Sequence, residues 1–285
     1  MIISVASGKG GTGKTSVAVN LALLWAEDKN IQFLDCDVEE PNANIFLKCP
    51  LDKKEKLNLL KPVIDSDKCI YCQKCAQVCI YNAIAIVSPR PSQTKGKTLV
   101  FYELCHSCGA CSLVCPVGAI TETEVEKGVV EEGQCGNIHF IRGLLRESES
   151  SPTPLVKAVK KKIDPRKDVI IDASPGTSCP VVEAVEGSDY TVLVTEPTPF
   201  GLHDLRLAVE MCRGLKIKFG VVINRSDLGG RQVYDYLKKE EITLLSEIPF
   251  SHELAYRYSQ GKTFVDLAEL KEIFVALKEK IEAEV

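Results

Sequence analysis

Eight of the thirteen cysteines fall into two short groups with identical spacing. Each group reads C-x2-C-x2-C-x3-C, and CIYCQKCAQVCIYNAIAIV, starting at Cys69, aligns with CHSCGACSLVCPVGAITET, starting at Cys105, at an offset of 36 residues. Three closely spaced thiolates can surround one corner of a metal cluster while the fourth points elsewhere. Because a repeat this short cannot bury a core alone, we expect its two halves to pack on each other.

Two kinds of metal site fit cysteines at this spacing. C-x2-C pairs also bind zinc, but zinc motifs usually use two separated pairs. Three cysteines at successive x2 spacings followed by a fourth suit an iron–sulfur cubane better. The proline usual after the fourth cysteine is present as Pro116 and is replaced by Ile80 in the first group.

The repeat resembles bacterial-type ferredoxins with two [4Fe–4S] clusters over about sixty residues, and in that family the fourth cysteine of each group binds the other cluster. The resemblance implies one-electron transfer through both clusters. The ligands that it implies for cluster 1 are Cys69, Cys72, Cys75 and Cys115. Those that it implies for cluster 2 are Cys105, Cys108, Cys111 and Cys79.

A glycine-rich segment near the N-terminus is suited to binding phosphate. Residues 8–15, GKGGTGKT, satisfy G-x4-G-K-[ST] between a short β-branched run and a helical pattern. In such a loop the backbone N–H groups curl around the phosphates, aided by the helix N-terminus. Lys14 is expected to reach the β- and γ-phosphates, and the Thr15 hydroxyl to take a Mg²⁺ position. The flanking pattern disfavours a glycine-rich turn without a ligand.

The additional lysine at position 9 makes this loop resemble the deviant Walker A motif of the MinD/ParA/nitrogenase iron protein class. The resemblance implies that Lys9 crosses a dimer interface to the partner's nucleotide, in a homodimer or in a dimer with a paralogue. It also implies that Asp37 positions the attacking water, that Asp172 lies near Mg²⁺, and that Asp35 supports Mg²⁺ through water.

The catalytic residues that this resemblance implies are Lys9, Lys14, Asp37 and Asp172. Asn224 and Arg225 resemble the motif on the adenine side of the site. The residues expected to bind ATP and Mg²⁺ are Gly8, Lys9, Gly10, Gly11, Thr12, Gly13, Lys14, Thr15, Ser16, Asp35, Asn224 and Arg225.

The five cysteines outside the repeat raise a further question. Cys is often simply a small buried apolar residue. Cys179, however, lies seven residues after Asp172, a spacing at which the nitrogenase iron protein carries a ligand to a cluster shared between subunits. This motivates the hypothesis that Cys179 and Cys135 hold a third, bridging cluster. The alternative is that Cys179 packs as an apolar residue and Cys135 is an incidental loop thiol.

The elements that must position these groups follow an α/β pattern. Apolar runs at 2–6, 31–34, 169–171, 191–195, 219–223 and 243–248 read as buried strands, and helical patterns at 202–212, 232–239 and 267–281 lie between and after them. This alternation predicts a P-loop fold with a mostly parallel sheet covered by helices on both faces. The expected domains are the first part of a P-loop ATPase domain at 1–61, an inserted small α+β ferredoxin-like domain at 62–124, and the remaining ATPase domain at 125–285.

Composition limits the partners. The formal net charge of -4 gives no basic field for nucleic acid. No run approaches the roughly eighteen apolar residues needed to cross a membrane. The start, MIISVASGKG, lacks the features of a signal peptide, so we expect a cytoplasmic protein.

Three functions fit these features. The first is an ATPase whose nucleotide-dependent dimer switching is coupled to electron transfer through two [4Fe–4S] clusters to a redox or metalloprotein partner. The second is an iron–sulfur cluster carrier or metallocentre maturation ATPase. The third is a positioning ATPase of the MinD/ParA type whose clusters sense redox state.

Overall fold

The computed structural model describes residues 1–147, 149 and 151–285 and divides the chain into two compact units. Unit 1 comprises Met1–Glu55, Val130–Leu144 and Thr153–Val285. Unit 2 comprises Lys56–Val129 and Leu145–Pro152. The expected insertion, 62–124, falls inside unit 2, which is wider because two long strands begin in one unit and end in the other.

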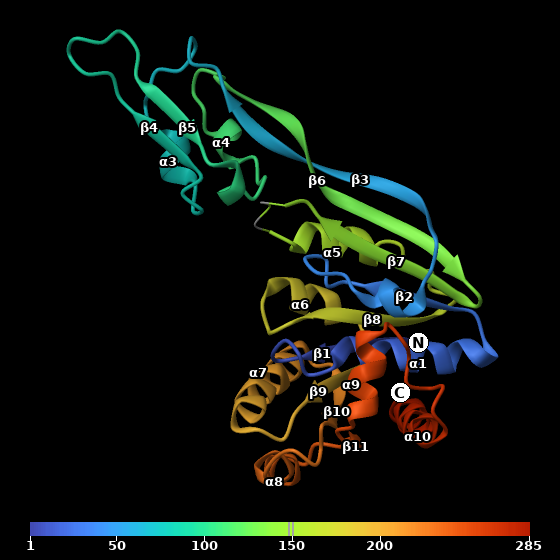
Figure 1. Cartoon of the computed structure of the whole chain (residues 1–285). Helices are drawn as coiled ribbons and strands as arrows, with labels where there is room; N and C mark the ends of the chain where they lie inside the picture. Colours follow the sequence, from blue (N-terminus) through green and yellow to red (C-terminus); the bar gives the residue numbers. More distant parts are fainter. Residues whose placement is uncertain (148, 150) are drawn as a thin grey trace. The chain divides into compact units, whose positions relative to one another are not determined.

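The strands of unit 1 that were expected from apolar runs form a parallel arrangement (Figure 1). They belong to a nine-stranded sheet with the order β11-β10-β9-β1-β8-β2-β7-β6-β3. The predicted α/β fold is therefore confirmed. The bounds of these strands are β1 Ile2–Ser7, β2 Ile31–Asp35, β8 Asp168–Pro175, β9 Tyr190–Thr195, β10 Lys218–Asn224 and β11 Leu244–Ile248.

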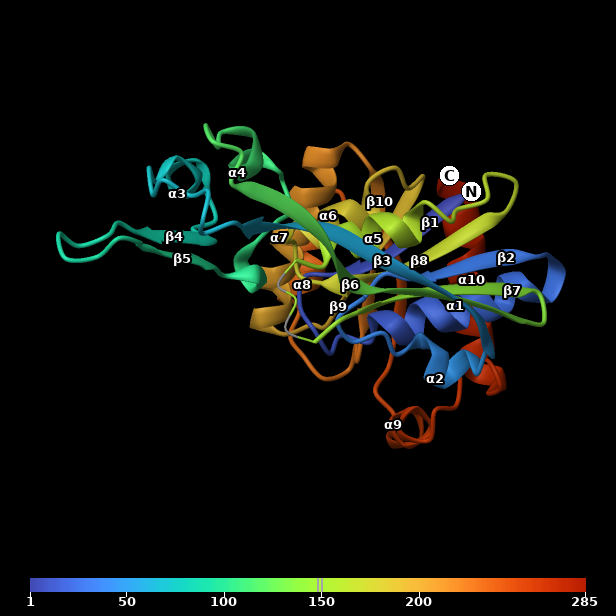
Figure 2. The same ribbon diagram turned by 90° about the horizontal axis from the view of Figure 1, so that it is seen from above.

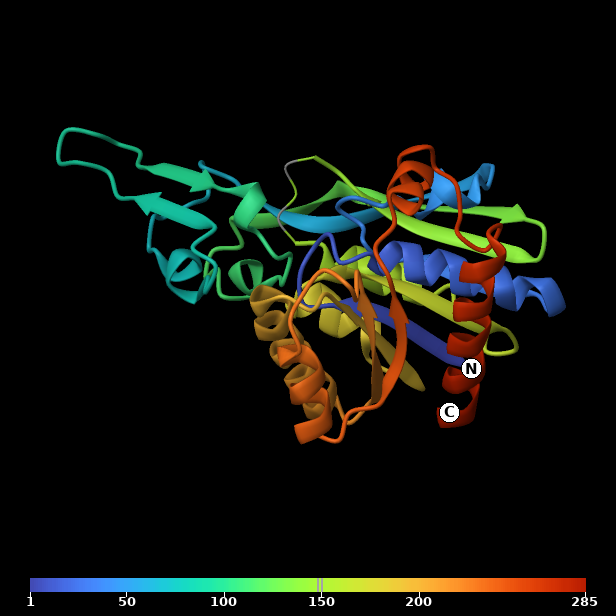
Figure 3. The ribbon, with the colours of Figure 1, turned by 60° about the horizontal axis from the view of Figure 1, so that its bottom comes forward.

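Helices of unit 1 cover both faces of these parallel strands. On one face α1 packs against α10, and on the other α5 packs against α6 and α7 against α8 (Figure 1). Figure 3 shows α9 beside α2, where the rings of Phe46 and Tyr258 lie 5.1 Å apart. The bounds are α1 Lys14–Asp28, α2 Ala43–Leu47, α5 Thr153–Lys160, α6 Cys179–Val185, α7 Pro199–Leu215, α8 Gln232–Lys239, α9 His252–Ser259 and α10 Ala268–Glu284.

Three further strands of this nine-stranded sheet were not expected from the sequence. They are β3 Leu51–Ile64, β6 Ile120–Cys135 and β7 Ile138–Leu145, and β7 pairs in parallel with β2. The lysine-rich first half of β3 is largely exposed on both faces, as is usual for an edge strand. Such a strand needs no alternation of apolar and polar residues, so the pattern that reveals a half-buried strand is absent from it. Cys135 accordingly ends a strand instead of lying in a loop.

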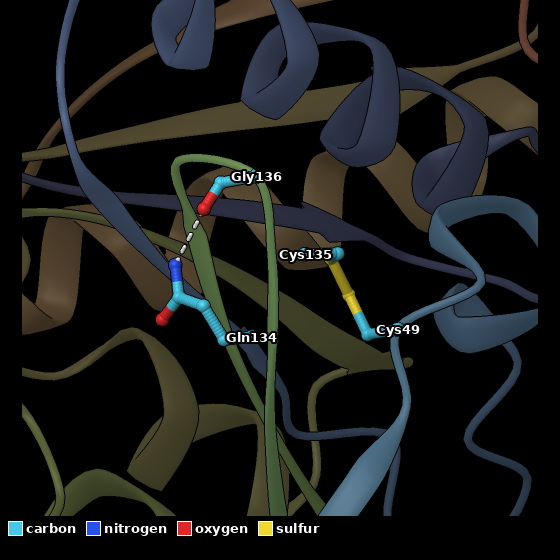
Figure 4. The surroundings of a disulfide bond; sticks show 4 residues. All are labelled: Cys49, Gln134, Cys135 and Gly136. Carbon is cyan, nitrogen blue, oxygen red and sulfur yellow. Dashed lines mark hydrogen bonds between the residues drawn. A yellow bond between two sulfur atoms is a disulfide. The ribbon is translucent and has the colours of Figure 1, made fainter.

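A disulfide joins Cys49 to Cys135 within unit 1, with their Cα atoms 5.0 Å apart (Figure 4). Beside it the Gln134 side chain donates to the Gly136 carbonyl, closing the tight turn between β6 and β7. The sequence did not predict this pairing, because the partners are 86 residues apart and only the pairing of β3 and β6 beside β7 brings them together.

Unit 2 contains the cysteine repeat. Strands β4 Ile84–Val87 and β5 Lys97–Val100 form an antiparallel ribbon (Figure 2), and α3 Lys74–Val78 packs against α4 Ala110–Leu113. A 3-10 turn, η1, spans Tyr102–Leu104. The small core is built from equivalent positions of the two halves, which therefore pack on each other as expected. These core residues are Cys75, Ile84, Cys111 and Ile120.

Two buried lysines and one carboxylate lie elsewhere in unit 2. Lys61 and Lys127 both donate to Glu149, at 2.8 Å and 2.7 Å, and Lys61 also donates to the Tyr102 carbonyl just before the second cysteine group. Burial alone would raise the pKa of Glu149, but the hydrogen bonds from the two lysines outweigh it and lower that pKa.

Among the described residues, no helix is long and apolar enough to cross a membrane.

Candidate functional site

The loop between β1 and α1 has the backbone that a phosphate cradle requires. Gly11 and Gly13 have φ angles of 78° and 91°, and Gly13 immediately precedes α1. A Cβ on Gly13 would lie 2.4 Å from the amide nitrogen of Asn224, which donates to the Thr12 carbonyl at 2.8 Å. Only glycine fits this close approach at a positive φ. Asn224, from the end of β10, thus fixes the loop from outside.

A cavity of about 430 Å³ opens beside this loop, a size typical of small-molecule sites. It extends from the loop to an apolar end formed by α9 and its flanking segments. The lining at that end is Pro249, Phe250, Leu254, Ala255, Tyr258 and Phe264. The sequence did not reveal this end of the cavity, since α9 carries no motif that marks it as part of a site.

Most of the residues predicted to bind nucleotide or to act in catalysis line this cavity. They are Gly10, Gly11, Gly13, Lys14, Thr15, Ser16, Asp37, Asn224 and Arg225. Within the described chain, the remaining predicted residues lie outside the lining: Gly8, Lys9, Thr12, Asp35 and Asp172. Glu40 and Asn42, which sequence reasoning missed, also reach the cavity because the chain turns back after β2 toward α2.

The side chain of Lys14 lies among three carboxylates, two on the neighbouring strands β2 and β8 and one just after β2. Its Nζ is 2.6 Å from Asp172 Oδ1, and both side chains are buried. Asp172 and Asp35 are direct neighbours across β8 and β2, while Asp37 follows two residues after Asp35. Burial would lower the pKa of Lys14, but the attraction of Asp172 and then of the other two carboxylates raises it.

Burial and neighbouring charges also change the pKa values of the aspartates around Lys14. Burial raises the pKa of Asp35 to about 8, with the charge of Asp172 adding to the effect, although the backbone N–H groups of Asp37 and Ala43 both donate to this carboxylate. Burial likewise raises the pKa of Asp37 to about 6.

The raised pKa values of Asp35 and Asp37 reflect carboxyl groups buried close together around one lysine. A divalent cation would supply the positive charge that favours their ionised forms. In the described chain Asp172 Oδ2 is buried without a hydrogen-bond partner. Mg²⁺ prefers oxygen ligands and retains several waters. The residues present therefore fit this ion beside a phosphate group.

Lys9 forms an ion pair with a carboxylate, Glu196, that the sequence did not mark as part of the site. Its Nζ lies 3.1 Å from Oε2 of Glu196, just after β9, and Arg225 Nη1 lies 2.5 Å from Oε1 of the same carboxylate. Glu196 is buried, whereas Lys9 is about one-third exposed. No motif marks Glu196, and only its place at the end of a parallel strand, on the edge where β1 also ends, could have drawn attention to it.

In unit 2 the eight repeat cysteines line two separate cavities. One is lined by a set that includes Cys69, Cys72, Cys75 and Cys115. The other is lined by a set that includes Cys79, Cys105, Cys108 and Cys111. Each cavity thus combines three cysteines of one group with the fourth of the other group.

The backbone around these cavities repeats with the sequence. Residues with positive φ occur in pairs 36 positions apart: Tyr71 with Ser107, Gln73 with Gly109, and Asn82 with Gly118. A positive φ is uncommon for a non-glycine residue and costs free energy, so its recurrence indicates a local constraint. The constraint directs backbone N–H groups at sulfur, as from Ala83 to Cys79 at 3.3 Å and from Ala119 to Cys115 at 3.2 Å.

The structure does not bring Cys135 and Cys179 together. Cys135 lies just before β7, at the end of the sheet where β2, β7 and β8 begin. Cys179 is the first residue of α6, which follows β8 at the opposite end of the sheet. Cys135 is also bonded to Cys49. Within one chain these two cysteines therefore do not form a common site, since position in the sheet, and not sequence order, decides which cysteines are near each other.

A parallel sheet with a glycine-rich loop between β1 and α1, a buried lysine and strand-end carboxylates defines a P-loop nucleotide-binding protein. Residues 3–264 match the family described as the CobQ/CobB/MinD/ParA nucleotide binding domain. The chain belongs to this family.

Similar proteins agree with this assignment. Two uncharacterized proteins of Methanocaldococcus jannaschii, MJ0579 and MJ0578, are 28% and 30% identical to the chain, over 95% and 80% of it and over 94% and 79% of their own lengths. The solved structure of the Pyrococcus furiosus cell division ATPase MinD has a TM-score of 0.61 at 19% identity, covering 100% of this chain and 99% of that one. It shows that the fold is shared.

A shorter likeness involves a different kind of protein. The pyruvate synthase subunit PorD of M. jannaschii is 33% identical over 67 residues, covering 24% of this chain and 71% of that protein.

Proposed function

We propose that this chain hydrolyses ATP as a dimer and couples the nucleotide-dependent switch to one-electron transfer through two [4Fe–4S] clusters to a partner protein. The observation that carries the proposal is the presence, in one chain, of a phosphate-binding cavity in unit 1 and of two four-cysteine cavities in unit 2. The partner is a redox protein or a metalloprotein.

The eight cysteines fit cubane clusters better than zinc. Structural zinc sites usually draw on two separated cysteine pairs, whereas each cavity is lined by three cysteines of one closely spaced run and a fourth from the other run. A [4Fe–4S] cluster takes four thiolates, one for each iron, so its ligands stand farther apart. Cys69, Cys72, Cys75 and Cys115 would hold one cluster and Cys79, Cys105, Cys108 and Cys111 the other. Each cluster supplies a one-electron carrier, and N–H groups aimed at the sulfurs stabilise their negative charge.

Different residues of unit 1 have different roles in the proposed hydrolysis of ATP. Backbone N–H groups of the loop and Lys14 bind the phosphates of ATP, so the developing charge meets positive groups already in place. Thr15 and Asp172 would hold Mg²⁺, with Asp35 acting through water. Asp37 lines the cavity at its polar end and orients the attacking water. The apolar end near Phe250 and Tyr258 accommodates the base.

Dimerisation completes the site. Lys9 lies outside the lining of its own cavity and is partly exposed, so on leaving Glu196 it could reach the nucleotide of a second copy or of a paralogue. Closure of the dimer would then require ATP in the site, which makes the association of the two chains depend on the nucleotide.

Rapid-mixing measurements on anaerobically reconstituted protein test the coupling. Chain reduced with titanium(III) citrate is mixed with cytochrome c as acceptor in the presence of MgATP, of MgADP or of no nucleotide. We expect cluster oxidation, followed by absorbance, to depend on MgATP in the wild type and to lose that dependence in the Lys14→Met variant. Equal rates under all three conditions would contradict the coupling, while iron and ATP-hydrolysis assays on the same samples report separately on cluster binding and hydrolysis.

A further inference from the structure

Glu196 is held in a fixed position beside the nucleotide loop. The segment that carries it lies against the first turn of α7: a Cβ on Gly201 would be only 2.2 Å from the Glu196 carbonyl oxygen, and Thr198 accepts a hydrogen bond from the Gly201 N–H. On its other side, the Pro197 carbonyl accepts from the Gly230 N–H. The backbone of Glu196 is thus fixed from two sides, and its buried carboxylate is directed at Lys9.

Glu196 has one buried carboxylate and two cationic partners. Its oxygens lie 3.1 Å from Lys9 Nζ and 2.5 Å from Arg225 Nη1. A buried charge that loses its only partner is strongly destabilising. Because Arg225 remains bound to the other oxygen, Lys9 can leave without leaving Glu196 unpaired. The arrangement therefore permits two positions of Lys9 at a moderate difference in free energy.

We propose that Glu196 is a positioning residue that holds Lys9 within its own chain and so opposes dimer closure until ATP in a second copy competes for the lysine. This inference rests on the proposed role of Lys9 and adds to it a residue that sets the threshold for closure. ATP supplies phosphate charge that Lys9 binds in place of the Glu196 carboxylate. Release of Lys9 is then part of the free-energy cost of association.

The test compares Glu196→Gln with Glu131→Gln. Glu131 is a matched control because it is also a buried carboxylate of unit 1 with one lysine and one arginine partner, Lys54 and Arg142, and it lies on β6 away from the nucleotide loop. Sedimentation velocity measures the monomer–dimer equilibrium with Mg²⁺ and a non-hydrolysable ATP analogue, and again with MgADP.

We expect Glu196→Gln to dimerise with the analogue at about tenfold lower protein concentration than the wild type, since a hydrogen bond to a charged group is lost from the monomer only. Glu131→Gln should dimerise like the wild type. In a Lys9→Ala background the Glu196→Gln substitution should have no effect, because the lysine that it frees is absent. Glu196→Asp, which keeps a carboxylate for Arg225, should fall between the wild type and Glu196→Gln.

The outcomes separate the two proposals. A wild-type chain that stays monomeric with the analogue, or a Lys9→Ala variant that dimerises like the wild type, would contradict the proposed role of Lys9. If wild-type dimerisation depends on Lys9 but folded Glu196→Gln and Glu196→Asp both match the wild type, the inference about Glu196 is overturned. An effect of Glu196→Gln that persists without Lys9 would overturn it as well.

Discussion

Lys14 and Asp172 bear opposite charges, and both side chains are buried in unit 1. Their side chains are 6% and 0% exposed and 2.6 Å apart. Removing one member of such a pair leaves the other buried without compensation, which costs more than removing both. Lys14 is therefore expected to matter for the stability of the fold as well as for phosphate binding, a dual role that the loop motif alone does not indicate.

Substitution of these two residues tests the dual role. We expect Lys14→Met to abolish ATP binding and to lower the free energy of unfolding by about 3–5 kcal/mol. The double variant Lys14→Met/Asp172→Asn should recover more than half of that loss without recovering ATP binding. Urea unfolding followed by the fluorescence of the single tryptophan, Trp25, which is buried in α1, reports the stability. Losses that simply add in the double variant would contradict the buried-pair interpretation.

At the level of elements, the duplicated cysteine segment shows how sequence repeats become paired sites. The left-handed residues recur at the same places in both halves, and the short helices α3 and α4 pack on each other. As a result the fourth cysteine of each half lines the cavity of the other half. The ligand exchange implied by the ferredoxin resemblance is thus compatible with the geometry of unit 2.

Paired cysteine substitutions distinguish exchanged from unexchanged ligation. With exchange, Cys79→Ala/Cys108→Ala removes two ligands of one cluster and leaves about four irons for each chain, whereas Cys79→Ala/Cys72→Ala damages both clusters and leaves almost none. Ligation within each group predicts the reverse. Iron analysis, together with the EPR signal of the reduced protein, identifies which pattern holds.

For the molecule as a whole, the disulfide between Cys49 and Cys135 closes a loop that contains the sequence of unit 2 from Lys56 to Val129. Both cysteines belong to unit 1, and Cys49 is part of its core. A covalent link across a long loop stabilises the folded chain chiefly by restricting the unfolded one. The disulfide is therefore expected to stabilise unit 1 at the two points where the chain passes into unit 2 and comes back from it.

Breaking this bond should weaken unit 1. We expect Cys135→Ala to lower the free energy of unfolding by about 2–4 kcal/mol under non-reducing conditions. A thiol reductant should lower the stability of the wild type by a similar amount and leave the variant nearly unchanged. The measurement is anaerobic urea unfolding with Trp25 fluorescence. A wild type insensitive to the reductant, with the variant equally stable, would count against the role given to this bond.

The sequence by itself determined the features that depend on local chemistry. The loop from Gly8 to Thr15, the six parallel strands and the cysteine repeat each follow from residue types at fixed spacing, because neighbouring residues in the chain are necessarily neighbours in space. Of these strands β11, expected to be buried, is instead a half-exposed edge strand. Helix α8, for example, was predicted with its exact bounds, Gln232–Lys239, from its own pattern. The mostly parallel sheet followed from the alternation of strands and helices.

Only the tertiary structure decided which distant residues meet. The edge strand β3 was missed because an exposed strand needs no apolar pattern, and the pairing of Cys49 with Cys135 required the strand order of the sheet. Glu196 reaches Lys9 and Arg225 because β1, β9 and β10 end at the same edge of parallel strands. Contacts between residues far apart in sequence depend on the packing of whole elements, and no local spacing encodes them.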